Sequence, residues 1–144
     1  MTTQSPPPLT GQDINLAARA VRDVLDALLD QAQLTFPQSL ALQTLAADSK
    51  PRDSLVADLA DRIRADRHAV AFALDGLIRR GLVSDAADGL RLTQSGKEHL
   101  ERTLAATQRA TAQLYRDFAP DDLATTRRVL VELIARAPTV QVGV

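Results

Sequence analysis

Helix start and stop signals recur at short intervals within residues 34–96, and they constrain the fold more than any other feature of the chain. Thr35 and Gln38 have the spacing of a capping box, in which each side chain bonds to a backbone N–H of the other residue. Pro37 is tolerated between them because it falls in a first helical turn. The sequence therefore predicts a helix that begins at Thr35 and ends near Asp48.

Two further short helices are predicted within the same segment. Residues 49–53 contain the breakers of a loop, after which Asp53 or Ser54 caps a helix. Asp66 caps the next helix, and Gly81 ends it as a C-terminal glycine. Each helix has one apolar face at helical spacing, formed by Leu55, Leu59 and Ile63 in the first and by Val70, Ala73, Leu74 and Leu77 in the second.

A β-hairpin is predicted directly after these helices. Leu82–Val83 and Leu90–Leu92 can each form a short strand, and Asp88–Gly89 between them is a strong turn signal. Short helices followed by a two-stranded hairpin are the pattern of a winged helix-turn-helix. The predicted fold class is therefore mainly α, with residues 34–93 forming a winged helix-turn-helix domain that binds DNA.

Long helices are predicted on both sides of this domain, behind a disordered N-terminal arm of residues 1–12. They cover residues 13–33, about 94–118 and 120–137, and their apolar stripes are too long to be buried against one small domain. A second copy of the chain is the economical partner, so the helices within 13–33 and 94–138 are predicted to form a helical dimerisation region. The predicted interface residues are Ile14, Val21, Leu28, Leu114, Phe118, Leu123 and Leu130.

Composition excludes several classes of function. Of the 144 residues 45% are hydrophobic and only 3% aromatic, so aliphatic side chains have to build the core. No cysteine is present, which excludes disulfides, thiol redox sensing and cysteine-ligated zinc, and two histidines are too few for a typical histidine-rich metal site. No catalytic motif is recognisable, so we expect no enzyme, metal or cofactor. We also expect no membrane partner and a cytoplasmic location. The net charge of −1 counts mildly against a nucleic-acid partner.

In their order and spacing, the motifs resemble those of the MarR family of winged helix-turn-helix transcription regulators. The resemblance covers residues 13–137 and rests on Leu34-Thr35-x-x-Gln38, Leu59-Ala60, Arg80-Gly81-Leu82-Val83, Leu92-Thr93-x-x-Gly96 and Pro120-Asp121-Asp122-Leu123. It implies a homodimer whose two winged domains bind a pseudo-palindromic operator in duplex DNA. It also implies a small, often aromatic ligand between the dimerisation and winged regions that lowers DNA affinity.

The resemblance places the helix after Asp66 in the major groove. With about 100° of rotation per residue, its outer face consists of His68, Phe72, Asp75 and Arg79. The family usually has small hydroxyl residues and an arginine here, whereas this chain has Ala69, Ala71 and Phe72. Phe72 can contact thymine methyl groups and Asp75 can accept from cytosine N4. The alternative is a rotated helix with Phe72 in the core.

Basic residues beside this helix are the predicted phosphate contacts. Arg64 and Arg67 flank the preceding turn, while Arg62 can instead pair with Asp58 on its own helix. The predicted DNA-binding residues are Arg64, Arg67, His68, Phe72, Arg79 and Arg91.

The hairpin departs from the family pattern in two respects. It is shorter than usual and lacks the family's Asp-x-Arg motif, whose arginine enters the minor groove. Asp85 and Asp88 make its tip acidic, and Arg91 is its only basic residue. Strong minor-groove readout is therefore not expected.

A ligand pocket is predicted where the first, second and fifth helices meet. Its candidate lining residues, each of which can equally be a packing residue, are Leu34, Phe36, Leu40, His99 and Thr103. The predicted function is that of a MarR-like transcriptional repressor, released from DNA by a small ligand. The alternative is a winged-helix module for protein–protein interaction or ligand sensing, favoured by an exposed Phe72, the acidic hairpin and the balanced charge.

Overall fold

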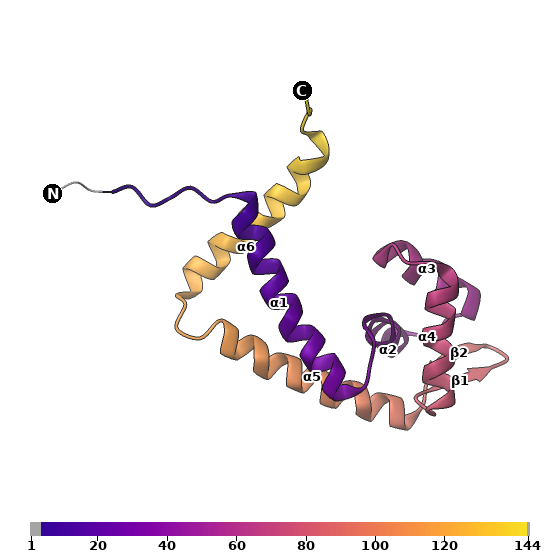
Figure 1. The fold of residues 1–144 in the computed structure, drawn as a ribbon. Coiled ribbons are helices and arrows are strands. Elements are labelled where there is room, and N and C mark those ends of the chain that lie inside the picture. Colours follow the sequence, from indigo (N-terminus) through magenta and orange to yellow (C-terminus); the bar gives the residue numbers. More distant parts are fainter. Residues whose placement is uncertain (1–3, 144) are drawn as a thin grey trace. The chain divides into compact units, whose positions relative to one another are not determined.

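The computed structural model describes residues 4–143, which form six α-helices, a two-stranded antiparallel sheet and a short 3-10 helix (Figure 1). Two compact units are present, Met1–Ala110 and Thr111–Val144. The elements are α1 (Gly11–Ala32), α2 (Phe36–Ala47), α3 (Arg52–Ile63), α4 (Arg67–Arg79), β1 (Val83–Ala86), β2 (Gly89–Leu92), α5 (Gln94–Leu114), α6 (Pro120–Arg136) and the 3-10 helix η1 (Ala137–Thr139). The mainly α winged helix-turn-helix class predicted from the sequence is confirmed.

A capping box begins α1. The Thr10 hydroxyl accepts the Asp13 backbone N–H at 3.2 Å, and the Asp13 carboxylate accepts the Thr10 backbone N–H at 2.9 Å. The Thr10 backbone N–H, and then its hydroxyl, hold the pKa of Asp13 below its usual value. Asp13 is therefore the third helical residue, and α1 includes Gly11 and Gln12, which the sequence had assigned to the N-terminal arm. Residues 1–3 of that arm lie outside the described part of the chain.

The two helices that follow differ in how well their starts were predicted. The Thr35–Gln38 capping box of α2 is confirmed, with Gln38 N–H donating to Thr35 Oγ1 at 3.3 Å and Thr35 N–H donating to Gln38 Oε1 at 3.0 Å. The cap predicted for α3 at Asp53 or Ser54 is wrong, since the helix begins at Arg52 after Pro51 and has no side-chain cap. Asp53 lies instead in the first turn, where an acidic group stabilises the helix electrostatically.

One apolar core holds the first unit together. Helix α2 contacts α3, α4 and β2, and α4 contacts α3 and β1. The inner faces predicted for α3 and α4 are confirmed, because all of those residues are buried except the half-buried Ile63. The largest side chains that are fully buried are Leu42, Leu55, Leu59, Leu74, Leu77, Leu90, Val70 and Val83.

The hairpin is longer than predicted. Val83 pairs with Leu92 and Ala86 with Gly89, so residues 84–86 extend β1 and only two residues form the turn. Lys50 forms a β-bridge to Leu90 on the other side of β2. The Lys50 N–H donates to the Leu90 carbonyl with an N···O distance of 3.1 Å, and the Leu90 N–H donates to the Lys50 carbonyl at 2.7 Å. Gly89 has φ of +122°, and a Cβ there would lie 2.7 Å from the Lys50 carbonyl oxygen. Glycine is thus required where the two backbones approach.

The chain leaves α5 at Leu114, four residues before the predicted end near Phe118. Asp117 adopts φ of +68°, which is incompatible with a continuous helix. Helix α6 then begins at Pro120 with Asp121 and Asp122 in its first turn, as predicted. None of the helices described in residues 4–143 is long and apolar enough to cross a membrane.

Candidate nucleic-acid interface

Helix α4 presents the face that the sequence predicted. The Asp66 carboxylate caps it by accepting the His68 backbone N–H at 2.7 Å. Phe72 is 71% exposed, and His68 and Arg79 are exposed with it, while the opposite face is buried. The alternative of a rotated helix with Phe72 in the core is therefore wrong.

Asp75 on this face forms an ion pair with an arginine from another helix. Arg52, the first residue of α3, donates to the Asp75 carboxylate at 2.5 Å. Both side chains are partly buried, so the pair links α3 to the outer side of α4. A carboxylate engaged in this way is less available to cytosine, and its charge repels phosphates less.

Three of the arginines in this region are used in holding the first unit together. Arg80 donates to the Gln33 carbonyl at the end of α1, 2.5 Å away. Arg62 donates to Thr44 Oγ1 at 3.4 Å, and the pair predicted with Asp58 is not among the ion pairs of the described residues. Arg52 is the partner of Asp75.

Arg64, Arg67 and Arg79 remain exposed and form no side-chain hydrogen bond or ion pair with residues 4–143. Arg64 occupies the turn between α3 and α4 in the left-handed conformation, with φ of +52°, and Arg67 is the first residue of α4. Arg79, at the end of α4, places its guanidinium carbon 5.8 Å from the centre of the Phe72 ring. Three free cations and one aromatic ring therefore lie along α4 and the turn before it.

The hairpin contributes a single cation. Arg91 forms an ion pair with Asp88, three residues before it, and both side chains are at least half exposed. Asp85 at the same tip is also exposed. The one basic group of the hairpin is therefore held by an acidic neighbour.

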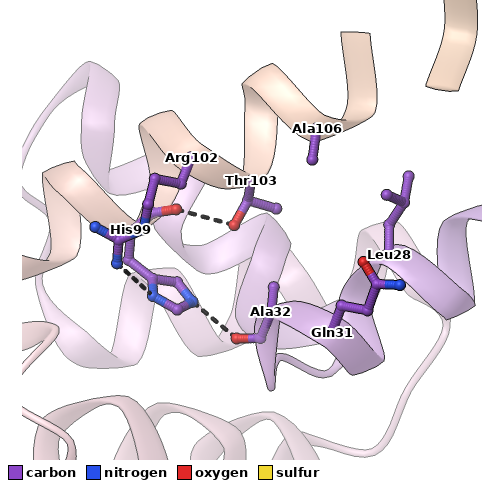
Figure 2. A pocket seen from close by; sticks show the side chains of 7 residues that line it. All are labelled: Leu28, Gln31, Ala32, His99, Arg102, Thr103 and Ala106. Atoms are coloured by element: carbon purple, nitrogen blue, oxygen red, sulfur yellow. Dashed lines mark hydrogen bonds between the residues drawn. The ribbon is translucent and has the colours of Figure 1, made fainter. Parts of the chain in front are cut away.

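The residues predicted to line one ligand pocket lie in two places within the first unit. A cavity of about 220 Å³ between α1 and α5 is lined by Leu28, Gln31, Ala32, His99, Arg102, Thr103 and Ala106 (Figure 2). A second cavity, of about 490 Å³, is lined by Arg22, Phe36, Pro37, Leu40, Arg62 and Ile63. Leu34 lines neither cavity because it is buried in the core.

His99 is held in place at the α1–α5 cavity. Its Nε2 lies 2.8 Å from the Ala32 carbonyl oxygen, and its Nδ1 lies 3.4 Å from Arg102 Nη2. Figure 2 marks both contacts with dashed lines. Because a guanidinium only donates, a neutral ring with its proton on Nε2 satisfies both contacts. No group of three or more potential metal ligands occurs in the described part of the chain.

The predicted dimer-interface residues are mostly uncovered in a single chain. In α1 and α5, Val21 and Leu114 are exposed, while Ile14 and Leu28 are half-buried. In the second unit, Phe118 and Leu130 are exposed, and α6 contains no buried residue.

Structural comparison identifies the fold. A Mycobacterium tuberculosis MarR family protein in complex with DNA is 23% identical, with a TM-score of 0.71 over 89% of this chain and 98% of that one. A complex of the same protein with salicylic acid gives 21% identity and a TM-score of 0.67 over 92% and 99% of the two chains. MepR, a transcription regulator of the Staphylococcus aureus multidrug efflux pump MepA, is 18% identical, with a TM-score of 0.72 over 90% and 99%. The chain has the MarR-family fold.

No protein-family model matches the sequence, and no curated protein sequence matches it. The helix predicted from the sequence to enter the major groove is α4, and the predicted hairpin is β1–β2. The motifs that carry the family resemblance do not indicate the Arg52–Asp75 ion pair or the exposed Phe72 in the middle of α4.

Proposed function

We propose that this chain is a transcription regulator, acting as a repressor, that binds a pseudo-palindromic site in duplex DNA as a homodimer. Arg64, Arg67 and Arg79 carry the proposal because they are exposed and unpaired at both ends of an otherwise well-packed helix. Arginines in this position, on and beside one exposed helix face, can bind phosphates and guanine. The DNA complex of the M. tuberculosis protein of the same fold supports the proposal.

Each of the six predicted DNA-binding residues has a proposed role. Arg64 and Arg67 contact phosphates on either side of the turn, which sets the register of α4 on the duplex. His68, Phe72 and Arg79 face the base edges of the major groove, and Arg91 approaches the backbone from the wing while bound to Asp88. In this assignment, residues 34–93 form the DNA-binding domain.

The test is a fluorescence-anisotropy titration of the intact chain against the DNA upstream of its own coding sequence. We expect saturable binding that weakens steeply from 50 to 200 mM salt, because protein cations displace condensed counterions from the duplex. A scrambled duplex of the same composition is the control and should bind more weakly at each salt concentration. Binding that does not depend on salt would contradict the proposal.

Release by a small ligand is the second element of the proposal. The α1–α5 cavity is smaller than the roughly 300–1,000 Å³ usual for small-molecule sites, whereas the cavity with Arg22, Phe36 and Arg62 lies in that range. Arg22, which is paired with Asp26 at 3.0 Å, lies over the Phe36 ring, and Arg62 lines the same cavity. These groups suit an aromatic anion, and a protein of the same fold has been solved with salicylic acid. Salicylate added to the same titration should therefore weaken DNA binding.

A homodimer is proposed from the uncovered apolar surface. Helix α6 carries Leu130, Val131, Leu133 and Ile134 at 38–74% exposure, with none of its residues buried. A run of exposed apolar side chains of this kind on a helix is stabilised in water when another surface covers it. We propose that a second copy covers this surface and the stripes in 13–33 and 94–138.

Light scattering on the intact chain should therefore give twice the mass of one chain. Ile134→Glu places a charge on the most exposed apolar position of α6 and should shift the mass toward that of a monomer. Thr125→Glu on the same helix is the matched control and should remain dimeric. A monomeric wild-type chain at micromolar concentration would rule out the homodimer.

A second candidate function is a winged-helix module that binds another protein or senses a ligand. The exposed Phe72 favours it, since an isolated aromatic side chain on a surface is a common anchor in protein interfaces. This candidate predicts no salt-sensitive DNA binding, so the titration described above separates the two.

A further inference from the structure

Phe72 is the most exposed of the chain's four aromatic residues, at 71%, although it lies in the middle of the proposed reading helix. A phenyl ring offers neither a donor nor an acceptor to a base edge. Placed against a polar edge, it would leave base atoms without hydrogen bonds, which costs free energy. The one apolar group in the major groove of unmodified DNA is the C5 methyl of thymine.

Arg79 is held next to this ring. Its guanidinium carbon lies 5.8 Å from the ring centre, within the range of a cation–π contact. Asp75 lies between the two residues on the same face but is bound to Arg52 at 2.5 Å. Arg79 therefore keeps its donors free for the bidentate contact that arginine makes with O6 and N7 of guanine.

We propose that Phe72 and Arg79 together read one dinucleotide step, a pyrimidine carrying a C5 methyl followed on its 3′ side by guanine, which is TpG in unmodified DNA. This inference rests on the proposed DNA-binding function and states what the recognition helix selects. The 5.8 Å separation exceeds one base-pair rise of about 3.4 Å and is less than two, so the groups can address neighbouring base pairs.

The chemistry has two consequences for the bound sequence. The C5 methyl of 5-methylcytosine occupies the same place as that of thymine. A methylated CpG step should therefore offer both the methyl contact to Phe72 and the guanine contact to Arg79. TpG and its complement CpA are also among the easily deformed steps of DNA, which lowers the cost of fitting the duplex to the protein.

The experiment begins with the intact chain and a pool of random duplexes, from which bound sequences are selected and read. Each thymine of the selected half-site is then replaced singly by uracil, which removes only the methyl group, and binding is measured by anisotropy. We expect about a fourfold loss at the TpG thymine, the equivalent of about 0.8 kcal/mol for one buried methyl group. Uracil at the other thymines is the internal control and should have little effect.

Protein variants assign that loss to the two side chains. Phe72→Ala should bind more weakly and no longer distinguish thymine from uracil at the step. Arg79→Ala should keep the thymine preference but lose the preference for guanine over adenine at the next position. Cytosine in place of the thymine should weaken binding by the wild-type protein. Methylation of that cytosine at C5 should then raise the affinity again by about fourfold.

The outcomes separate this inference from the proposed function. If wild-type protein selects a salt-sensitive site but binds its uracil and thymine forms equally, the reading of the methyl group is wrong and the DNA-binding function stands. Retention of the uracil effect in Phe72→Ala would assign the methyl to another residue and overturn the inference. If no duplex is selected at any salt concentration, both fail, and Phe72 is better explained as an anchor for a protein partner.

Discussion

Gly96→Ala should lower the stability of the first unit by about 3 kcal/mol, the upper part of the range for overpacking in a tight core. A Cβ at this position would lie 2.0 Å from the Leu82 carbonyl oxygen, well inside van der Waals contact. That oxygen cannot move freely, because it also accepts the Thr93 backbone N–H at 3.1 Å. Relief of the clash therefore requires a shift of buried backbone between α4 and the wing.

A thermal melt followed by circular dichroism is the measurement, and a loss of this size in a chain of 144 residues corresponds to roughly 10 °C. Gly11→Ala is the matched control, since a Cβ there meets nothing within 4 Å and lies in the first turn of α1. It should be neutral or slightly stabilising, because alanine restricts the unfolded chain more than glycine does. A Gly96→Ala melting temperature within about 2 °C of wild type would show that Leu82 and Gly96 do not press together.

This glycine illustrates which features can be predicted from sequence. The caps of α2 and α4, the glycine at the end of α4 and the inner faces of the helices act within a few residues of one another, so their spacing was sufficient. The same reasoning predicted the outward direction of Phe72 from the buried positions of α4. The Leu92-Thr93-x-x-Gly96 pattern was noted only as a motif, and its physical reason is the approach of Leu82, fourteen residues earlier.

The features that were not predicted join distant parts of the chain. Arg52 and Asp75 are 23 residues apart, and Arg80 and Gln33 are 47 apart, so no periodicity relates them. Arg62 had a suitable acid four residues away, yet it contacts Thr44 on α2 instead. A local ion pair on an exposed helix contributes only about 0.3–0.5 kcal/mol, which other contacts easily outweigh.

The start of α1 was misplaced for a related reason. Thr10 and Asp13 form a capping box as regular as that of α2, but the prolines before them were interpreted as part of a disordered arm. The first strand of the hairpin was predicted too short, because Ser84–Ala86 shows no alternation of apolar and polar residues. Its pairing depends on the backbone of β2, which Lys50 also engages.

Arg67→Glu should weaken binding of the selected duplex by about 100-fold at 0.1 M salt, because it removes a phosphate contact and adds repulsion in each half of a dimer. The helix itself should not suffer, since a carboxylate in the first turn of α4 is electrostatically favourable. The slope of log affinity against log salt concentration should also become shallower by about two, one for each lost contact. An effect on binding without an effect on folding is what distinguishes a phosphate contact from a structural role.

Arg109→Glu is the matched control for this variant. It makes the same change in charge on an exposed residue of α5, about 140° around the helix from the predicted interface residue Leu114. If long-range charge alone governed binding, the two variants would weaken it equally and change the slope alike. We expect Arg109→Glu to remain within about threefold of wild type, because α5 carries none of the residues proposed to contact DNA and exposed charges that are not in contact are weakened by screening at 0.1 M salt. Unchanged affinity in Arg67→Glu would mean that the first turn of α4 does not approach the duplex, and the orientation proposed for the helix would be wrong.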